Sequence, residues 1–519
     1  MKSQYWADQI AEKLIKNRNK DKFVIASGIT PSGTIHFGNF REIITTDIVG
    51  RAIKDAGKKV RFIYSWDDYD VLRKVPGNMP KKYILKKSLG LPVSKVPNIF
   101  GTKHDSYAAY LESELEDSVD SVGINPEFIR QGKQYPKLKY VKGIKTALEK
   151  RKEIAEILNK YRKEPLDENW FPLTIYDPDT GYESKKVIDY DNKYTLTYEN
   201  NEGKTKEINF KTTPGVKLLW KADWPMRWSH EKVDFEPGGK DHSTYGSSYT
   251  VGKDIVKLFG WIAPEYVMYD FINMKGSMGK MSSSKGNVQS LKSILGYYLP
   301  ELVRYTFAGR TPKTEIFYPM DEGIFKHYED FYYTERVAFG LEKVSDKERV
   351  QQERVYRMSV VKSVPKKIPV QPSFKHVVEL MNIFQGNTKL AIDHVKITEK
   401  IKSKSDIERY ENIMNCAWNW INNFADDKYI FNINKSKIKT SLTSEQKNAL
   451  NDLAKILSKN ITSEKLFSKF PEIMNNNNLN AKTFFPIIYK LLINKEKGPR
   501  LAPFIIAIGR EKVIKLISQ

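Results

Sequence analysis

A ten-residue segment of small and polar residues, Thr30–Asn39, carries the first side chains that could do chemistry. Its sequence, TPSGTIHFGN, follows the apolar run KFVIASGI and precedes a segment with helical periodicity. A glycine-rich connection between a strand and a helix exposes backbone N–H groups and the positive end of the helix dipole, which together favour a phosphate site. His36 and Asn39 add side-chain donors. The alternative is an ordinary turn whose histidine is hydrogen-bonded.

A second loop of small residues, Gly279–Asn287, carries lysines. Its sequence is GKMSSSKGN, with Lys280 and Lys285 on either side of the serines. Lysines on such a loop can stabilise the negative charge that builds up on a phosphorus centre during transfer. The alternative is an ordinary basic linker.

The elements that must position the first loop are predicted from hydrophobic periodicity. A strand is expected over Lys22–Gly28, a helix over Arg41–Ala56 and a second strand over Val60–Ser65. This alternation is typical of a parallel sheet wrapped by helices, whose ligands lie beyond the carboxyl ends of the strands. Thr30–Asn39 and the acidic segment SWDDYD, Ser65–Asp70, both fall at those ends.

The pattern divides the chain into four stretches. Residues 1–85 are predicted to form the first half of an α/β domain, and 215–320 the second half, which includes the lysine-bearing loop. Between them, 86–214 reads as an insertion, with helices over about Asp105–Val122 and Tyr140–Lys163 followed by β-hairpins. Only helical periodicity is found over 321–519.

The composition indicates a globular and strongly basic protein. The 519 residues include 86 Lys and Arg against 63 Asp and Glu, a net charge of +23. Such a charge attracts a polyanion such as nucleic acid. The alternative is that the chain simply uses lysine often, and that the excess of positive charge lies on solvated surfaces without a binding role. The single cysteine, Cys416, excludes internal disulfides and zinc sites built on several thiolates. With no apolar run of membrane-spanning length and no signal-like N-terminus, we expect a cytoplasmic protein that has no membrane contact.

The two loops, in this order, resemble the paired signatures of class I aminoacyl-tRNA synthetases. His36–Asn39 is similar to His-Ile-Gly-His, and Lys280–Ser284 is similar to Lys-Met-Ser-Lys-Ser. Asn39 replaces the second histidine, and Ser283 stands where the second lysine is expected. The missing charge is expected from Lys285, with Lys275 and Lys280 as the other candidates.

Four longer blocks narrow the resemblance to the class I lysyl-tRNA synthetases. They are ASGITPSGTIHFGNFREI, RFIYSWDDYDVLRKVPGNMP, WKADWPMRW with the following EKVDFEPGGKDH, and MKGSMGKMSSSKGN. The resemblance covers most of the first 330 residues and continues weakly at the C-terminal end. It implies an α/β fold with a Rossmann-type parallel-sheet catalytic domain, split by an insertion and followed by all-α C-terminal domains.

The resemblance also implies ATP-dependent ligation of L-lysine to tRNA(Lys) through lysyl-adenylate. His36 and Asn39 would contact the ATP phosphates, and Lys280 and Lys285 would stabilise the developing charge. Mg²⁺ would arrive with ATP, so no metal ligand is assigned on the protein. The residues expected to bind ATP are Pro31, Ser32, Gly33, His36, Gly38, Asn39, Lys280, Met281, Ser282, Ser283 and Ser284.

Recognition of lysine requires a carboxylate for the ammonium group and aromatic walls for the methylene chain. Asp67 and Asp68 are the candidate carboxylates, although either could instead cap the next helix. Trp220 is a candidate wall of the lysine site, although for each of Trp220, Trp224 and Trp228 taken alone a place in the core is the better interpretation. The residues expected to bind lysine are Thr30, Asp67, Asp68, Trp220, His242 and Tyr269.

The remaining expectations concern metals and partners. Some family members carry cysteine-rich metal knuckles in the inserted region, but Phe171–Phe210 contains no cysteine, so no structural zinc is expected. In this family a helical region recognises the anticodon with aromatic and basic side chains. The resemblance therefore implies that residues 321–519 contact the anticodon of the tRNA. We expect a monomer. Two rival hypotheses stay open: a class I synthetase for another amino acid, such as glutamate, and a non-catalytic tRNA-binding relative.

Overall fold

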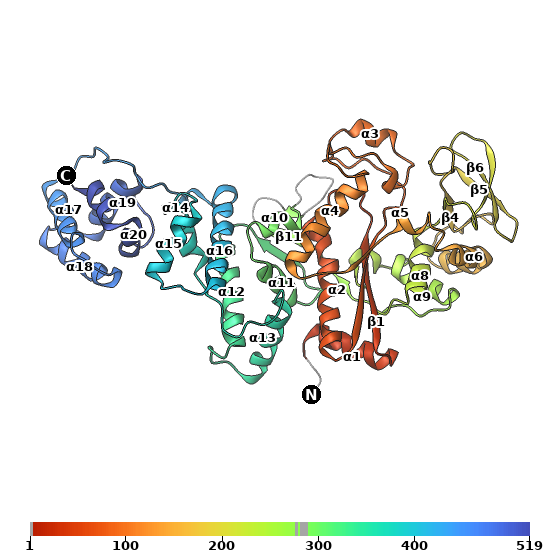
Figure 1. The fold of residues 1–519 in the computed structure, drawn as a ribbon, viewed down its shortest axis with the longest axis horizontal. Coiled ribbons are helices and arrows are strands. Elements are labelled where there is room, and N and C mark those ends of the chain that lie inside the picture. The colour runs from red at the N-terminus through yellow and green to blue at the C-terminus, as the bar shows by residue number, and fades with distance from the viewer. Residues whose placement is uncertain (1–3, 276–278, 281–288, 519) are drawn as a thin grey trace. The chain divides into compact units, whose positions relative to one another are not determined.

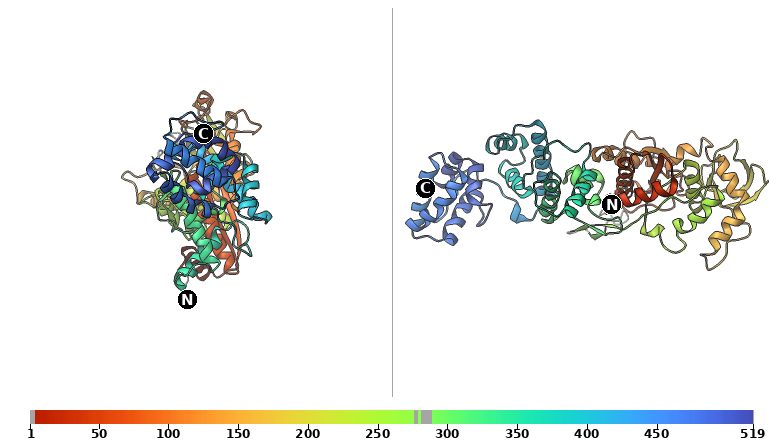
Figure 2. Two further views of the ribbon diagram at one scale, coloured as in Figure 1. Left: turned by 90° about the vertical axis from the view of Figure 1, so that its left-hand side faces the viewer. Right: turned by 90° about the horizontal axis from the view of Figure 1, so that it is seen from below.

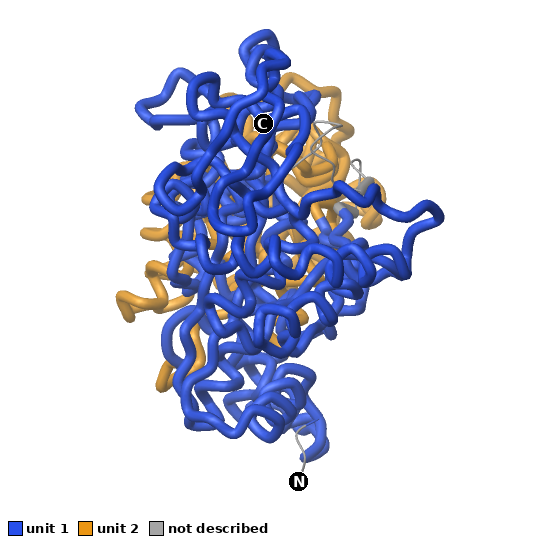
Figure 3. Tube along the Cα trace, turned by 90° about the vertical axis from the view of Figure 1, so that its right-hand side faces the viewer, with its two compact units in different colours: residues 1–295, 300–319, 334–364 blue, residues 296–299, 320–333, 365–519 orange. Residues whose placement is uncertain are grey.

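The computed structural model describes residues 4–275, 279–280 and 289–518. The chain divides into two compact units, which Figure 3 distinguishes by colour. The first comprises Met1–Leu295, Pro300–Pro319 and Thr334–Val364, and the second comprises Gly296–Leu299, Met320–Tyr333 and Pro365–Gln519. Among the described residues, no helix combines the length and the apolar character that a membrane crossing requires.

A three-stranded parallel sheet organises the first unit (Figure 1). Its strands, in spatial order, are β1 (Lys22–Ile29), β2 (Lys59–Trp66) and β3 (Glu127–Arg130). The apolar run of β1 is buried from Phe23 to Ser27, as a strand covered on both faces requires. Ile29 pairs with Trp66, so the segments that follow β1 and β2 leave the sheet at the same edge. The α/β class predicted from the sequence is confirmed.

Helix α2 (Phe37–Asp55) connects β1 to β2 and packs against both strands. Its apolar side, which includes Ile43, Ile44 and Ile48, is fully buried. Gly50 permits the close packing, because a Cβ atom there would lie 2.6 Å from the Cδ1 atom of Ile25 in β1. The predicted strand–loop–helix arrangement around Thr30–Asn39 is therefore present.

The region between β2 and α8 contains helices followed by antiparallel strands. Its elements are α3 (Lys82–Lys87), α4 (Tyr107–Val119), α5 (Gln131–Gln134), α6 (Val141–Glu149), α7 (Arg151–Asn159), β4 (Leu173–Ile175), β5 (Lys186–Tyr190), β6 (Thr195–Glu199), β7 (Thr205–Asn209) and β8 (Val216–Leu218). The stretch predicted as helical over 140–163 breaks at Lys150 into α6 and α7. The predicted hairpins are present as the sheet β5-β6-β7, and β4 pairs with β8. These strands share one apolar core with α6 and α7.

The third strand of the parallel sheet lies inside the range 86–214, which was predicted to be an insertion. β3 pairs in parallel with β2, from Ile63 opposite Glu127 to Trp66 opposite Arg130. The sheet therefore continues into this range, and the inserted helices and hairpins lie on both sides of β3 in the sequence. The division of the chain at residues 85, 214 and 320 stays a prediction.

The first unit contains further helices and strands, one of them before β1 and the others after the inserted region. They are α1 (Trp6–Arg18), α8 (Trp220–Glu231), β9 (Gly238–Gly239), α9 (Ser248–Leu258), β10 (Met268–Tyr269), β11 (Ile272–Lys275), β12 (Gly279–Lys280), α10 (Leu291–Leu295), α11 (Pro300–Ala308), β13 (Ile316–Pro319) and α13 (Asp346–Ser359). A parallel bridge joins Ile25 of β1 to Phe235, just before β9. β9 pairs with β10, and β11 with β13, in parallel, whereas β11 and β12 are antiparallel.

The second unit contains helices and connecting segments, and no strand among its described residues. Beside the first part of α12 (Gly323–Ala338), it contains α14 (Phe374–Ile383), α15 (Thr388–Thr398), α16 (Lys404–Asn423), α17 (Ser444–Leu457), α18 (Ser463–Asn476), α19 (Ala481–Ile493), α20 (Leu501–Ile508) and α21 (Arg510–Ile517). Helices α17–α21 enclose a common apolar core and form a compact bundle (Figure 2). The all-α C-terminal part predicted from the sequence is confirmed, and Cys416 is buried in α16.

Candidate active site

A cavity of about 680 Å³ lies at the carboxyl ends of β1 and β2. It brings together residues from the loop after β1, the start of α2, the turn after β2, and the segments around β9 and β10. Pro31 and Asp68 are not among the residues that line it. The predicted residues that do line it are Thr30, Ser32, Gly33, His36, Gly38, Asn39, Asp67, Trp220, His242 and Tyr269.

The loop between β1 and α2 is held in place by its own side chains and by the inserted region. The backbone N–H of His36 donates to Oδ1 of Asn39 at 3.0 Å, so Asn39 caps the first turn of α2. Its amide nitrogen is left as a donor. The Tyr107 hydroxyl of α4 donates to the carbonyl oxygen of Ser32 at 3.1 Å. Gly38 is required beside the His36 ring, because a Cβ atom would lie 2.8 Å from Nδ1.

His36 lines the cavity as a neutral imidazole at neutral pH. Burial lowers the pKa of His36 below its usual value of 6.5. Its Nδ1 atom is buried and has no hydrogen-bond partner among the described residues. A neutral ring offers one N–H donor and one acceptor. The geometry therefore suits hydrogen bonding to a ligand in the cavity rather than attraction by a fixed positive charge.

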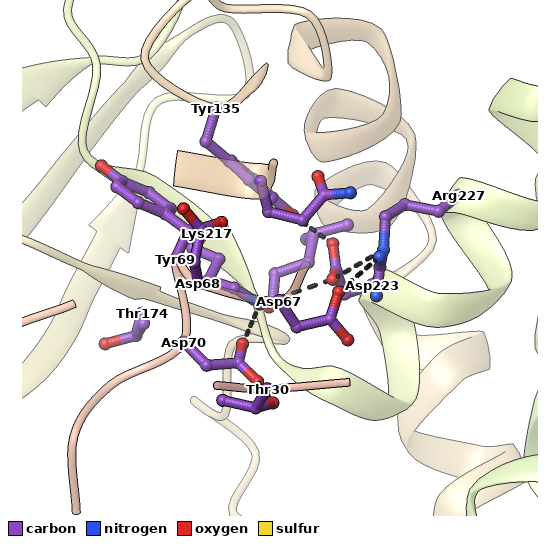
Figure 4. Close-up of polar contacts among 12 residues, drawn as sticks. Thr30, Asp67, Asp68, Tyr69, Asp70, Tyr135, Thr174, Lys217, Asp223 and Arg227 are labelled. Carbon is purple, nitrogen blue, oxygen red and sulfur yellow. Dashed lines mark hydrogen bonds and ion pairs between the residues drawn. The ribbon is translucent and has the colours of Figure 1, made fainter. Parts of the chain in front are cut away.

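Asp67 and Asp70, which line the cavity, belong to a network of ion pairs whose other charged members, Lys217, Asp223 and Arg227, are buried (Figure 4). Asp67 Oδ1 lies 2.7 Å from the Arg227 guanidinium, and Asp70 Oδ1 lies 2.9 Å from Lys217 Nζ. The Thr30 hydroxyl donates to Asp70 Oδ2 at 3.0 Å. Asp223 Oδ2 pairs with both cations, lying 3.1 Å from Arg227 Nε and 3.4 Å from Lys217 Nζ. Asp223 Oδ1 accepts a hydrogen bond from the Tyr135 hydroxyl.

This network carries a formal charge of −1 when all its groups are ionised. Three carboxylates, Asp67, Asp70 and Asp223, face the two cations Lys217 and Arg227. Burial raises the pKa of Asp67, although Arg227 opposes that shift. Burial would also raise the pKa of Asp70, but the charge and hydrogen bond of Lys217 lower it below its usual value. The sequence reasoning missed Asp70, and only its place in SWDDYD could have indicated it.

The Asp68 side chain makes different contacts from those of Asp67. Its Oδ1 accepts the backbone N–H of Gly132 at 2.6 Å, which joins the turn after β2 to α5. Burial raises the pKa of Asp68 to about 7. Neither Asp67 nor Asp68 caps the next helix along the chain, because that helix, α3, begins at Lys82.

The three tryptophans of α8 are divided between the cavity and the core. Trp220 lines the cavity, and its Nε1–H donates to the hydroxyl of Ser248 at 3.0 Å. The next two tryptophans, Trp224 and Trp228, are buried, in agreement with the core alternative. The His242 ring lies 6.4 Å from the Trp220 ring, centroid to centroid.

Glu42 also lines the cavity, and the sequence reasoning missed it. It lies on the first turn and a half of α2, where its Oε1 accepts the backbone N–H of Gly28 at 2.9 Å. Its Oε2 accepts the hydroxyl of Tyr269 at 2.6 Å. Burial raises the pKa of Glu42 to about 8, although these two hydrogen bonds oppose the shift. No sequence signal distinguished Glu42 from an ordinary helix glutamate.

The lining of the cavity is acidic although the chain as a whole is basic. Its carboxylates are Glu42, Asp67, Asp70, Asp241 and Asp270. No lysine or arginine is among the described residues that line it. The carboxylates of this lining favour a ligand that brings a cationic group close to them.

The second predicted loop falls largely outside the described residues. Lys280 belongs to β12, opposite Asn273 of β11, and its side chain is not described. Met281, Ser282, Ser283, Ser284 and Lys285 lie outside the described residues. Their roles stay predictions. Among the described residues, no group of three or more His, Cys, Asp or Glu side chains could hold a metal ion.

Comparison with known proteins identifies the family. The family model described as tRNA synthetases class I (K) matches residues 4–362. A lysine–tRNA ligase of Borreliella burgdorferi is 42% identical over 525 residues, covering 100% of both chains. One of Pyrococcus horikoshii is 39% identical over 525 residues, covering 98% of both. A solved glutamate tRNA ligase of Elizabethkingia meningosepticum is 13% identical, with a TM-score of 0.46, covering 95% of this chain and 98% of that one. The chain therefore belongs to the class I (K) tRNA synthetases, as the resemblance of its loops and longer blocks predicted.

Proposed function

We propose that the protein ligates L-lysine to tRNA(Lys) in an ATP-dependent reaction that passes through lysyl-adenylate. In the first step an oxygen of the lysine carboxylate bonds to the α-phosphorus of ATP, and the bond from that phosphorus to pyrophosphate breaks. In the second step the 2′-OH of the terminal adenosine of the tRNA takes the lysyl group, and AMP leaves. Similarity to lysine–tRNA ligases over the full length of the chain supports this assignment.

The acidic lining of the cavity is the observation that carries the choice of amino acid. Five carboxylates and no described lysine or arginine suit a substrate whose side chain ends in an ammonium group. A glutamate side chain would meet carboxylates and no described lysine or arginine in this lining. One contact between two unpaired carboxylates at 4 Å costs about 4 kcal/mol at an effective dielectric constant of 20. This cost argues against the glutamate-specific alternative.

Within the cavity we assign the lysine-binding residues by contact and charge. Asp67 and Asp70 supply the network of charge −1, and Thr30 supports it through Asp70. We assign Asp70 to the lysine site in place of the predicted Asp68, because the Asp68 carboxylate does not line the cavity and accepts the backbone N–H of Gly132. The aromatic and imidazole walls of the lysine site are assigned to Trp220, His242 and Tyr269.

The ATP site is assigned to the loop after β1. Its backbone N–H groups, the N-terminus of α2 and the neutral His36 are suitable donors for phosphate oxygens. Asn39 keeps its amide donor free for the same purpose. Mg²⁺ would be bound mainly by ATP itself. We assign Lys280 and Lys285 to the charge that develops on the α-phosphate, as the resemblance implies.

The second unit offers a surface for tRNA. A cavity of about 970 Å³ is lined there by two aromatic side chains, Tyr429 and Phe431, and by more cations than carboxylates. The cations are Lys375, Lys428, Lys495, Lys497 and Arg500, against the carboxylates Glu379 and Glu496. Basic side chains beside aromatic rings suit unpaired nucleotides. A monomeric, cytoplasmic enzyme stays a prediction from the sequence.

The test is ATP–pyrophosphate exchange with each of the twenty amino acids, followed by charging of tRNA. We expect lysine alone to support exchange. Exchange with glutamate or another amino acid would establish the first rival hypothesis. A protein that binds tRNA but supports neither exchange nor charging would be the non-catalytic relative.

A further inference from the structure

A surface segment beside the active-site cavity carries positive charges and no negative ones. This rim segment, residues 73–89, follows β2 and the acidic turn and contains α3 (Figure 1). Its two ends meet at Leu72, whose backbone N–H donates to the carbonyl oxygen of Leu91 at 2.8 Å. The carbonyl oxygen of Leu72 accepts the backbone N–H of Gly90 at 3.1 Å. The rim segment is therefore a closed loop of the first unit.

The rim segment reaches the cavity through two of its residues. Pro76 lines the cavity. The side-chain amide of Asn78 donates to the hydroxyl of Thr34, in the loop after β1, at 3.1 Å. The side chains of Met79 and Leu85 are buried and anchor the segment. The charged residues that follow Asn78 are therefore held at the rim of the active site.

The charge of this part of the sequence is entirely positive. Between Asp70 and Asp105 the chain contains seven lysines and one arginine, and no aspartate or glutamate. The arginine, Arg73, is paired with Glu183 at 2.9 Å. The five lysines of the rim segment are exposed, and none has an ion-pair partner among the described residues. Their charge is therefore available to a ligand. These lysines are Lys74, Lys81, Lys82, Lys86 and Lys87.

The arrangement of these charges does not stabilise α3. Lys81 and Lys82 lie at the N-terminal end of the helix, where a positive charge is unfavourable beside the positive end of the helix dipole. Lys82 and Lys86 are four positions apart, so their like charges lie next to each other on adjacent turns. Features that oppose the stability of their own element are expected at functional sites. The lysines of α3 therefore indicate a contact with a partner.

The same helix exposes an aromatic ring. The side chain of Tyr83 is 63% exposed. Tyr83 follows Lys82 directly and lies one turn before Lys86 and Lys87. Unpaired bases of RNA stack on exposed aromatic rings, and basic side chains contact the phosphates that join them. A base-paired stem offers no free base faces to such a ring, so α3 fits unpaired nucleotides.

We propose that the rim segment binds the unpaired 3′ end of the tRNA, with its lysines on the phosphates and Tyr83 against a base. The proposal rests on the proposed function, whose second step brings the terminal adenosine into the cavity. The phosphates of this end need cations, and no lysine or arginine is among the described residues that line the cavity. The lysines of the second signature are assigned to the α-phosphate of ATP. The rim segment supplies further cations next to the loop after β1.

The test is the affinity of the full chain for tRNA(Lys), measured by filter binding, and for the same tRNA truncated after the last base pair of its acceptor stem. Tyr83→Ala should weaken binding of the intact tRNA about fivefold or more, the effect of one lost stacking contact. Lys82→Ala combined with Lys86→Ala should also weaken it. This double variant should reduce the slope of log K against log salt by about 1.4, because each phosphate contact on a single strand contributes about 0.7.

The truncated tRNA separates the 3′ end from the rest of the molecule. Because it lacks the unpaired nucleotides, it should bind the α3 variants and the unmodified protein equally well. In charging assays with intact tRNA, the KM for tRNA should rise in both α3 variants, whereas the KM for lysine should stay the same. All of these changes introduce alanine, the residue with the highest helix propensity, so α3 should persist.

Matched variants separate this surface from general electrostatic attraction. Lys22→Ala combined with Lys59→Ala removes the same charge from two exposed lysines that pair in register. They lie at the amino ends of β1 and β2, away from the cavity, so tRNA affinity should stay within about twofold. Tyr83→Phe keeps the aromatic ring and should bind tRNA like the unmodified protein.

Unchanged affinity for intact tRNA in both α3 variants would overturn the proposal. An equal loss with the truncated tRNA, or in the Lys22 and Lys59 double variant, would overturn it as well. If the lysine variant of α3 does not fold, equal affinities of Tyr83→Ala and Tyr83→Phe would overturn it. An unmodified protein that charges no tRNA with lysine would instead refute the proposed function.

Discussion

The backbone N–H of Phe37 donates a hydrogen bond to the carbonyl oxygen of Gln289 over 2.7 Å. Phe37 is the first residue of α2 and follows His36 of the first signature, whereas Gln289 follows the second signature in the sequence. On the other side of the second signature, the Arg41 guanidinium donates to the carbonyl oxygens of Asp270 and Phe271 at 2.7 and 2.9 Å. The start of α2 is therefore bonded to described residues on both sides of the second signature.

Replacing Arg41 should separate the two signatures. Arg41 is only 2% exposed and donates to four carbonyl oxygens, the other two being those of Pro312 and Thr314. Arg41→Met leaves these acceptors unpaired, so we expect the free energy of unfolding of the first unit to fall by about 3 kcal/mol or more. Lysine-dependent pyrophosphate exchange should fall by at least about 100-fold at a temperature where the variant is still folded.

Arg51 provides the matched control for that experiment. It also donates to backbone carbonyls, those of Val360 and Gly123, but it does not line the active-site cavity. Arg51→Met should lower the thermal unfolding temperature without a comparable loss of exchange. Full exchange activity in folded Arg41→Met would refute the positioning role of Arg41.

His36 should be necessary for activation but not for tRNA binding. Burial lowers the pKa of His36, so we expect a neutral ring that donates a hydrogen bond to ATP at neutral pH. His36→Ala should reduce exchange by about 100-fold or more, the usual cost of a lost transition-state donor. Its tRNA affinity, measured by filter binding, should stay within about twofold of the original. The control is His104→Ala, which changes a partly buried histidine outside the cavity and should leave both quantities unaltered.

Lys217 should contribute to stability in a pH-dependent manner. Lys217→Met leaves Asp70 and Asp223 with an unbalanced buried charge, so we expect a loss of about 3–5 kcal/mol near pH 7. Lys217 lowers the pKa of Asp70, so the stability from this pair is present above the unfolded pKa of about 3.9 and is lost as the pH falls through the folded value. The difference in unfolding temperature between the variant and the original should therefore shrink below pH 4.

The control for Lys217 is Lys193→Met, at an exposed position of the β-hairpin region. This change should alter stability by no more than about 0.5 kcal/mol. A difference for Lys217→Met that is constant from pH 3 to pH 7 would show that the pKa of Asp70 is not coupled to Lys217.

The basic cavity of the second unit should contribute to tRNA affinity. Lys497 and Arg500 are exposed and have no ion-pair partner among the described residues. Substituting both by Ala should weaken tRNA binding about three- to tenfold and reduce the slope of log K against log salt by about 1 to 2. Lysine-dependent exchange without tRNA should be unchanged. Lys482→Ala, an exposed lysine of α19 outside the cavity, is the control, and an equal effect there would indicate general electrostatic attraction only.

The sequence predicted the parts of the site that depend on local pattern. The apolar run of β1, the glycines of the loop and the periodicity of α2 each specify their element within a few residues. The partners of the buried charges could not be predicted in this way. Asp67 and Arg227 are 160 positions apart, and Glu42 and Tyr269 are 227 positions apart. Only the packing of the sheet brings them together. The sequence analysis also did not predict β3, because its four residues, EFIR, are too few to show a strand period.

The central claim is that one cavity, at the ends of β1 and β2, binds both the nucleotide and the lysine. It is tested most directly by a crystal structure of the full chain with a non-hydrolysable lysyl-adenylate analogue, lysyl-sulfamoyl adenosine. We predict that the sulfamoyl group contacts the loop 30–39 and that the lysyl ammonium groups lie among Glu42, Asp67 and Asp70. An analogue bound outside this cavity, or bound with its lysyl side chain directed into solvent, would contradict the account.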